Sequence, residues 1–147
     1  MDPGSIDGAV GTDVTRLQAY ARRPDAPGFT ELQDAARIAQ GRGAKGFLLI
    51  YRGMEGASIE KRTIPLTEEV KIGCQDGGVN TVVIADQKKT ISRRHLCVSP
   101  EGNNFYVEDL GSTNGTFFET ARVTGRTLLN RDGVLAFGDA RAAFYKL

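Results

Sequence analysis

The pattern of hydrophobic and polar residues changes near residue 44. From there to residue 147, short apolar or alternating runs are separated by turn-forming residues, which is typical of β-strands joined by tight connections. The predicted strands are Gly46–Arg52, Lys61–Leu66, Val70–Cys74, Thr81–Ala85, Leu96–Ser99, Asn104–Leu110, Thr116–Phe118, Thr127–Leu129, Val134–Phe137 and Ala142–Leu147. Strands this short and this frequent predict an all-β fold, a β-sandwich of about ten to eleven strands.

Alternation within two neighbouring strands indicates which side chains face the core. Leu96 and Val98 point one way in the first strand, and Phe105 and Val107 share one face of the next. We therefore expect a hairpin with these residues in the core and Cys97 on the outer face, in no buried structural role.

Residues 1–43 show helical periodicity instead. Thr30 to Gln33 has the form of a capping box, which begins a helix that ends near Gln40. An earlier helix is predicted over Asp13–Arg22. Helices shorter than about 12 to 15 residues are marginal in water unless they pack against something. The sequence thus predicts a flexible or weakly helical N-terminal leader over residues 1–43 and one folded domain over residues 44–147.

The charge and composition exclude several classes of function. Nineteen basic and 18 acidic residues leave a net charge of +1, so no broad field attracts nucleic acid or a membrane surface, and any anion site must be local. No run of about 18 apolar residues is present. Two cysteines and one histidine are too few for a zinc site, and we expect no metal and no cofactor. Free thiols favour a reducing intracellular compartment, the cytoplasm or nucleus, while organelle targeting stays open if the N-terminus is truncated.

Three motifs occur in a fixed order in the second part of the chain. They are Ile72-Gly73-Cys74, then Ser92-Arg93-Arg94-His95, then Asp109-Leu110-Gly111-Ser112-Thr113-Asn114-Gly115-Thr116. This order resembles the forkhead-associated (FHA) domain family, whose signature is a Gly-Arg at a strand end, a Ser-Arg-x-His and an Asp-Leu-x-Ser-x-Asn-Gly-Thr. The likeness covers roughly residues 46–147. It implies a β-sandwich that recognises a phosphothreonine-containing segment of a partner and is not an enzyme.

The residue types fit that chemistry without the family name. A phosphate ester carries about −1.5 to −2 charges at pH 7 and three strong acceptor oxygens, so its binding site needs several donors gathered from adjacent loops. Serine, threonine, asparagine and arginine supply such donors. Loops held at one edge of a rigid sandwich lose little entropy when the ligand arrives.

The resemblance implies a role for each motif residue. Ser92 would donate its hydroxyl to the phosphate, with Arg93 beside it. Thr113 would contact the phosphate or the nearby main chain, and Asn114 would hold the peptide backbone. Arg94 and Lys71 are auxiliary candidates for phosphate contact.

The remaining motif residues are expected to be structural. The resemblance implies that His95 fixes the recognition loop and that Gly73, Asp109 and Gly115 maintain the scaffold.

The sequence departs from the family at Cys74, where the signature arginine would contact phosphate. Losing one charge-assisted contact of about 1.5 to 3 kcal/mol weakens binding about ten- to a hundredfold. Either Arg93, Arg94 or Lys71 compensates, or the chain is an FHA-like interaction domain that binds its partner, or dimerises, independently of phosphate. Glu119-Thr120 is a second departure, because the family commonly has Asn-Gly there, and it predicts an acid near the binding edge.

Other interpretations of these residues are weaker. Ser92, His95 and Asp109 contain the groups of a catalytic triad, but the first two are only three residues apart and no nucleophile elbow surrounds the serine. Lys88-Lys89 is predicted to be an exposed loop, and the arginines and the Thr113-Asn114-Gly115 turn can also be ordinary surface features.

The partner itself stays open in the sequence. It is expected to be a separate phosphothreonine-containing protein, or the same chain's leader phosphorylated at Thr12, Thr15 or Thr30, since a tethered ligand has a high effective concentration. The oligomeric state is also left open.

Overall fold

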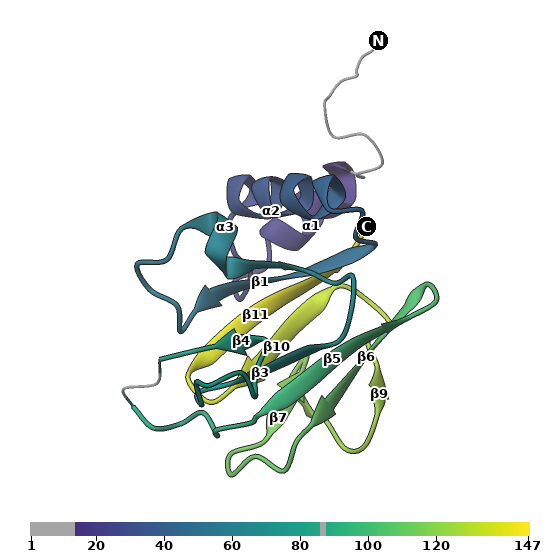
Figure 1. Cartoon of the computed structure of the whole chain (residues 1–147). Coiled ribbons are helices and arrows are strands. Elements are labelled where there is room, and N and C mark those ends of the chain that lie inside the picture. Colours follow the sequence, from purple (N-terminus) through teal and green to yellow (C-terminus); the bar gives the residue numbers. More distant parts are fainter. Residues whose placement is uncertain (1–13, 86–87) are drawn as a thin grey trace.

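The fold is a sandwich of two β-sheets with helices on one outer face (Figure 1). The computed structural model describes residues 14–85 and 88–147, so Thr12 and Asp13 of the leader lie outside the described residues. Eleven strands are present in the described part, which confirms the predicted all-β class and strand number. Within those ranges, no helix is both long and apolar enough to cross a bilayer.

The larger sheet has six strands in the order β2-β1-β11-β10-β7-β8. Their bounds are β1 Gly46–Arg52, β2 Thr63–Pro65, β7 Thr116–Phe118, β8 Ala121–Arg122, β10 Gly133–Phe137 and β11 Ala140–Lys146. The predicted strand Lys61–Leu66 begins late, because Ile59–Arg62 form the short helix α3 and only Thr63–Pro65 pair with β1.

The smaller sheet has five strands in the order β4-β3-β5-β6-β9. Their bounds are β3 Val70–Gly73, β4 Val82–Val83, β5 Leu96–Glu101, β6 Asn104–Asp109 and β9 Thr127–Leu128. Strands β3 and β4 are parallel, whereas β3, β5, β6 and β9 pair in antiparallel fashion.

The main core lies between the two sheets. Val98 of β5 pairs with Val107 of β6, as the alternation predicts, and both are fully buried together with Leu96 and Phe105. Phe144 of β11 packs edge-on against Phe105 from the opposite sheet.

The prediction that Cys97 is not buried is wrong. Its side chain alternates with those of the core residues, as expected, but the residue is only 5% exposed. Its Sγ lies 3.6 Å from the hydroxyl of Ser99, whose Oγ is 3.5 Å from the Glu69 carboxylate. Burial raises the pKa of the Cys97 thiol. Neighbouring polar side chains on the outer face, such as Ser99, therefore lie against Cys97. The alternation of residues predicts which face a side chain is on, but not whether its neighbours bury it.

Helices α1 (Val14–Ala21) and α2 (Phe29–Gly41) pack on the outer face of the larger sheet (Figure 1). Leu17 and Leu32 are fully buried there, in a second apolar cluster with residues of β1, β10 and β11. The expectation of a flexible leader is thus not met over residues 14–43, because docking supplies the stability that short isolated helices lack. The domain boundary at residue 44 stays a prediction.

The start of α2 also differs from the prediction. Gly28 is its N-cap residue, and no side chain caps the free backbone amides there. Thr30 lies inside the helix and is exposed, so the proposed capping box does not form. The true start lies two residues earlier, directly after Pro27 and Gly28, where the chain leaves the loop.

Polar contacts fix α1 on the sheet. The Tyr20 hydroxyl donates to the carbonyl of Gly133 at 2.7 Å, and Arg16 Nε donates to Asp132 at 2.8 Å. The Arg16 guanidinium lies 4.2 Å from the centre of the Tyr145 ring. These contacts join α1 to Asp132 in the β9–β10 connection, to the start of β10 and to β11.

Candidate functional site

The loop that contains Ser92 and Arg93 is bound along the end of β3. The Cys74 amide donates to the Ser92 carbonyl, and the Gln75 amide to the Arg93 carbonyl, both at 3.1 Å. A Cβ atom at Gly73 would lie 2.1 Å from that Arg93 oxygen, closer than real Cβ contacts allow. Only glycine therefore permits this approach, which places the residue at position 74 beside Ser92.

His95 joins two loops through one imidazole ring. It is fully buried, its Nδ1 accepts from the Ser92 amide at 3.0 Å, and its Nε2 donates to the Gly115 carbonyl at 2.8 Å. This pattern requires a neutral ring with the proton on Nε2. The geometry supports the scaffold role that the resemblance implies.

Asp109 organises the second loop. Its carboxylate accepts from the Ser112 amide at 2.9 Å, the Ser112 hydroxyl at 2.5 Å and the Thr116 hydroxyl at 2.7 Å. Burial acts to raise the pKa of Asp109, but the hydrogen bonds from Ser112 and Thr116 outweigh it, so its pKa lies below the usual value. The Ser112 hydroxyl also accepts from the amide of Gly115, whose φ of 85° favours glycine. The turn is thus fixed from within.

The two loops contact each other at the candidate residues. Ser92 Oγ accepts from the Thr113 amide at 3.0 Å, and Asn114 Nδ2 donates to the Thr90 carbonyl at 2.9 Å. Ser92, Thr113 and Asn114 are therefore brought together at one edge of the sandwich.

These residues line a hollow of about 530 Å³, which we call the rim pocket. The sequence-predicted residues in its lining are Ser92, Arg93, Arg94, Thr113 and Asn114. The half-buried Cys74 and the exposed Lys89 also line it. Lys89, Arg93 and Arg94 are its cations, and no carboxylate lines it among the described residues. The pocket is suited to an anion.

Lys71 is not brought to the rim pocket. It is exposed on β3, opposite Cys97 of β5, and its Nζ lies 3.9 Å from Glu69. It lies one residue before Ile72 on the strand, so alternation aims its side chain away from the core and toward the sheet's outer face.

Sequence reasoning missed two residues of this site. Lys89, treated as part of an exposed loop, has a φ of 57° and lines the rim pocket, while Lys88 pairs with Asp139 at 3.4 Å instead. Asn80, read as part of a strand, is buried, and its Nδ2 donates to the Gln75 and Arg93 carbonyls at 2.9 and 2.7 Å. For Asn80, the sequence signal was a polar amide at the start of an apolar run. For Lys89, the position depends on a backbone turn that has no signal in the sequence.

The geometry gives no support to a catalytic triad. His95 accepts from the backbone amide of Ser92 rather than from its hydroxyl, and the Asp109 carboxylate is occupied by Ser112 and Thr116. The three residues are thus held in scaffold contacts.

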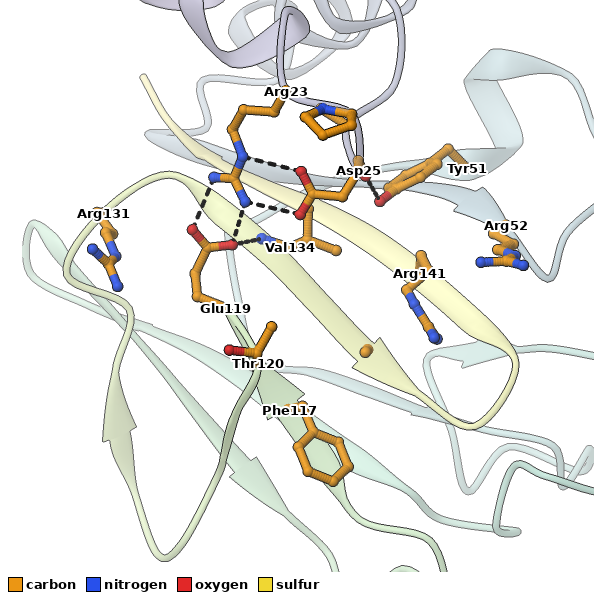
Figure 2. A pocket seen from close by; sticks show the side chains of 13 residues that line it. Arg23, Asp25, Tyr51, Arg52, Phe117, Glu119, Thr120, Arg131, Val134 and Arg141 are labelled. Carbon is orange, nitrogen blue, oxygen red and sulfur yellow. Dashed lines mark hydrogen bonds and ion pairs between the residues drawn. The ribbon is translucent and has the colours of Figure 1, made fainter.

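The prediction that Glu119 places an acid near the binding edge is wrong. Glu119 and Thr120 form the two-residue β7–β8 turn with φ of 51° and 70°, and neither lines the rim pocket. The Glu119 carboxylate accepts from both terminal nitrogens of Arg23, at 2.8 and 2.6 Å, and from the Val134 amide at 3.0 Å (Figure 2). Burial acts to raise the pKa of Glu119, but Arg23 and the Val134 amide outweigh it and lower the pKa.

Comparisons with known proteins agree with this geometry. The model of the FHA domain family matches residues 70–138. The FHA domain-containing protein FhaB of Mycolicibacterium smegmatis is 44% identical over 70 residues, which are 48% of this chain and 43% of that protein. The match therefore spans less than half the length of this relative.

Two solved structures show the extent of the likeness. The FHA domain of the CT664 protein from Chlamydia trachomatis superposes with a TM-score of 0.60 at 23% identity, over 71% of this chain and 99% of that one. A second FHA domain, solved in work on phosphothreonine-dependent FHA domain interactions, has a TM-score of 0.56 at 27% identity, over 69% of this chain and 96% of that one. The motifs, the two-sheet fold and the family match lead to one conclusion: residues 70–138 match the FHA domain family, and the fold around them is that of an FHA domain.

Proposed function

We propose that the rim pocket binds a phosphothreonine-containing segment of a partner protein, so that the chain serves as a non-catalytic signalling or scaffold module. One observation carries the proposal. Hydroxyl, amide and cationic groups from two loops line a single hollow that contains no carboxylate among the described residues. The match of residues 70–138 to a family that includes phosphothreonine-dependent domains supports the same conclusion.

Ser92 has the geometry of a phosphate donor. Its oxygen already accepts from the Thr113 amide, while its backbone amide is bonded to His95. The hydroxyl hydrogen thus remains for a phosphate oxygen. The Thr113 side chain is exposed beside it and contributes a second hydroxyl. Both donors are held by backbone contacts, so little ordering is needed when the ligand binds.

Three cations compensate in part for Cys74. Lys89, Arg93 and Arg94 are all exposed and line the rim pocket, and together their charge exceeds the −1.5 to −2 or so of a phosphate ester. Being exposed, each is screened by solvent, and none of the three stands at position 74, where the resemblance places the phosphate-contacting arginine. We therefore expect binding that depends on phosphate but is weaker than with an arginine at position 74.

Asn114 and two apolar residues would contact the rest of the ligand. The Asn114 amide is fixed by its bond to Thr90 and lies where it can hold a peptide backbone. Leu110, which is 38% exposed, and Ile91 also line the pocket and offer apolar surface to the threonine methyl group. Burying one methyl group contributes about 0.8 kcal/mol, so the preference for threonine over serine would be modest.

A separate protein is a better partner than Thr15 or Thr30 of the chain's own leader. Thr15 and Thr30 lie within helices α1 and α2, and moving either into the rim pocket as an extended segment would pull a helix from the sheet. That step would expose Leu17 or Leu32, which are fully buried. The two cysteines are free thiols, in keeping with a partner met in a reducing intracellular compartment.

The test compares a phosphothreonine peptide library with its unphosphorylated twin by fluorescence anisotropy. The phosphorylated form should bind, and Ser92→Ala, Arg93→Ala and Lys89→Ala should each weaken binding several-fold or more. Lys71→Ala is the matched control, because it removes an exposed lysine outside the pocket and should leave affinity unchanged. Equal affinity for both peptide forms would instead establish the phosphate-independent interaction domain.

A further inference from the structure

A second hollow, of about 650 Å³, lies on the outer face of the larger sheet beside the α1–α2 connection (Figure 2). We call it the arginine groove. Its floor includes Phe117 of β7 and Ala136 of β10, which are Cα partners across the sheet and are partly exposed. It shares no lining residue with the rim pocket. The helices cover the neighbouring part of this face and leave the groove open.

The groove holds more positive charge than its own acids neutralise. Its two carboxylates, Asp25 and Glu119, are both bonded to Arg23. Arg52, Arg131 and Arg141 also line it, and none of the three has a carboxylate partner in the part of the chain that the structure describes. The unbalanced charge is local, since the whole chain carries only +1.

Two of these arginines are held side by side. Arg52 of β1 and Arg141 of β11 are direct Cα partners across the strands. Two like charges placed opposite each other repel, and this repulsion destabilises the fold. Arg141 Nη1 donates to the Gly138 and Ala140 carbonyls at 3.0 and 2.8 Å, which fixes the guanidinium in place. A bridging anion would relieve their repulsion.

The wall of the groove is fixed before any ligand arrives. The Tyr51 hydroxyl donates to the Asp25 carbonyl, and Arg23 is clamped between Asp25 and Glu119 (Figure 2). Burial raises the pKa of Tyr51 to about 12, and Arg141, Arg23 and Arg52 act against that rise.

We propose that the arginine groove binds an acidic segment of a protein partner, with carboxylates on Arg52, Arg131 and Arg141 and an apolar side chain on Phe117 and Ala136. Guanidinium groups match carboxylates through paired hydrogen bonds. The volume lies within the range of about 300 to 1,000 Å³ found for ligand pockets and admits a few side chains. An apolar floor between separated cations fits a peptide of mixed acidic and apolar residues better than a uniform polyanion.

This inference goes beyond the phosphothreonine site, because it concerns another face and needs no phosphate. The experiment titrates the full-length chain, labelled with ¹⁵N, with an unphosphorylated peptide of alternating glutamate and leucine at low salt. The amide resonances of Phe117, Ala136 and Arg141 should shift, while those of Ser92 and Thr113 should not.

Variants make the result specific to the groove. The double substitution Arg52→Ala, Arg131→Ala removes two exposed side chains and should weaken peptide binding at least tenfold. Arg42→Ala is the matched control, because Arg42 is exposed after α2 and lines neither hollow. Unchanged amide spectra elsewhere would show that the double variant is folded.

Three outcomes would overturn the proposal. The double variant could bind the peptide as tightly as the parent chain does. The shifts could cluster at Ser92 and Thr113, which would assign the acidic peptide to the rim pocket. A single-stranded oligonucleotide could shift the groove resonances at lower concentration than the peptide, which would replace an acidic protein segment with nucleic acid.

Discussion

The rim pocket and the helix-covered face are stabilised in different ways. The pocket depends on hydrogen bonds between loops, centred on buried His95, Asn80 and half-buried Asp109. The helix-covered face depends on apolar packing around Leu17 and Leu32, with polar contacts at its margin. Among the described residues, none of the hydrogen bonds that hold the pocket's loops together involves a residue of α1 or α2.

Because of this difference, we expect the helices to determine the stability of the fold and the rim pocket to determine ligand affinity. Damage to the helices should lower the free energy of unfolding without altering the pocket, because its loops are fixed to β3 and to each other. Changes at the pocket surface should alter affinity with little effect on folding. The substitutions below test that separation from both sides.

Leu17→Ala should have the largest effect. Leu17 is fully buried between α1 and the sheet, so truncation should lower the free energy of unfolding by about 2 to 5 kcal/mol. Chemical denaturation measures the loss, and phosphothreonine peptide affinity of the folded variant should stay within about twofold. Val14→Ala is the control, since Val14 is 39% exposed on the same helix. An effect of Leu17→Ala no larger than that of the control would mean that α1 does not dock.

Cys74→Arg tests the pocket side. The new guanidinium would stand beside Ser92 and should add one charge-assisted contact of about 1.5 to 3 kcal/mol, which raises phosphopeptide affinity about ten- to a hundredfold. Calorimetric titration measures the gain. Cys74→Ala separates the added charge from loss of the thiol and should change affinity little. A gain that is equal for unphosphorylated peptide would contradict the assignment of this position to phosphate.

Tyr20→Phe should have a smaller effect on stability. It removes the hydroxyl that donates to the Gly133 carbonyl but keeps the ring that stacks near Tyr145. The loss should be about 1 kcal/mol, the usual contribution of one hydrogen bond. Thermal or chemical denaturation measures it, and peptide affinity should again be unchanged. A variant as stable as the parent chain would show that this bond is replaced by water.

Glu119→Gln should have the smallest effect, and it should depend on pH. The folded-state pKa of Glu119 is lowered, so its stabilisation is present above the unfolded-state pKa and is lost as pH falls through the folded-state pKa. Because ion pairs with partial exposure contribute about 0.2 to 1 kcal/mol, the variant should be less stable by that amount at pH 7. Denaturation at pH 7 and pH 3 measures the difference, which should shrink in acid; a constant difference would rule out an ion-pair origin.

The sequence predicted the sandwich well because its strands carry local signals. Leu96, Val98, Phe105 and Val107 show their faces by alternation alone. The principal pocket residues were predicted from sequence motifs, and the resemblance to the FHA family indicated that these motifs form one site. β8 was not predicted, since Ala121–Arg122 has neither alternation nor β-branched residues.

The docking of the helices could not be read from the helices alone. The buried face of α2 consists largely of alanines, such as Ala35, Ala36 and Ala39. Because alanine is only weakly hydrophobic, the sequence of α2 shows no strong apolar stripe. The better signal lay in β1, where Phe47 through Ile50 are apolar on both faces, as expected for a strand covered on each side. The position of Lys89 depended on a backbone turn set by tertiary contacts.

The β7–β8 turn has a consequence for engineering the chain toward higher heat resistance. Threonine is β-branched and strained at the φ of 70° found for Thr120, where glycine carries no such penalty. Exchanging Thr120 for glycine should thus raise the melting temperature, whereas adopting the full Asn-Gly pair of the family would also remove Glu119 and leave Arg23 with Asp25 as its remaining carboxylate partner among the described residues. A consensus design that copies both positions would relieve strain in the hairpin but weaken the contact between the β7–β8 turn and the α1–α2 connection.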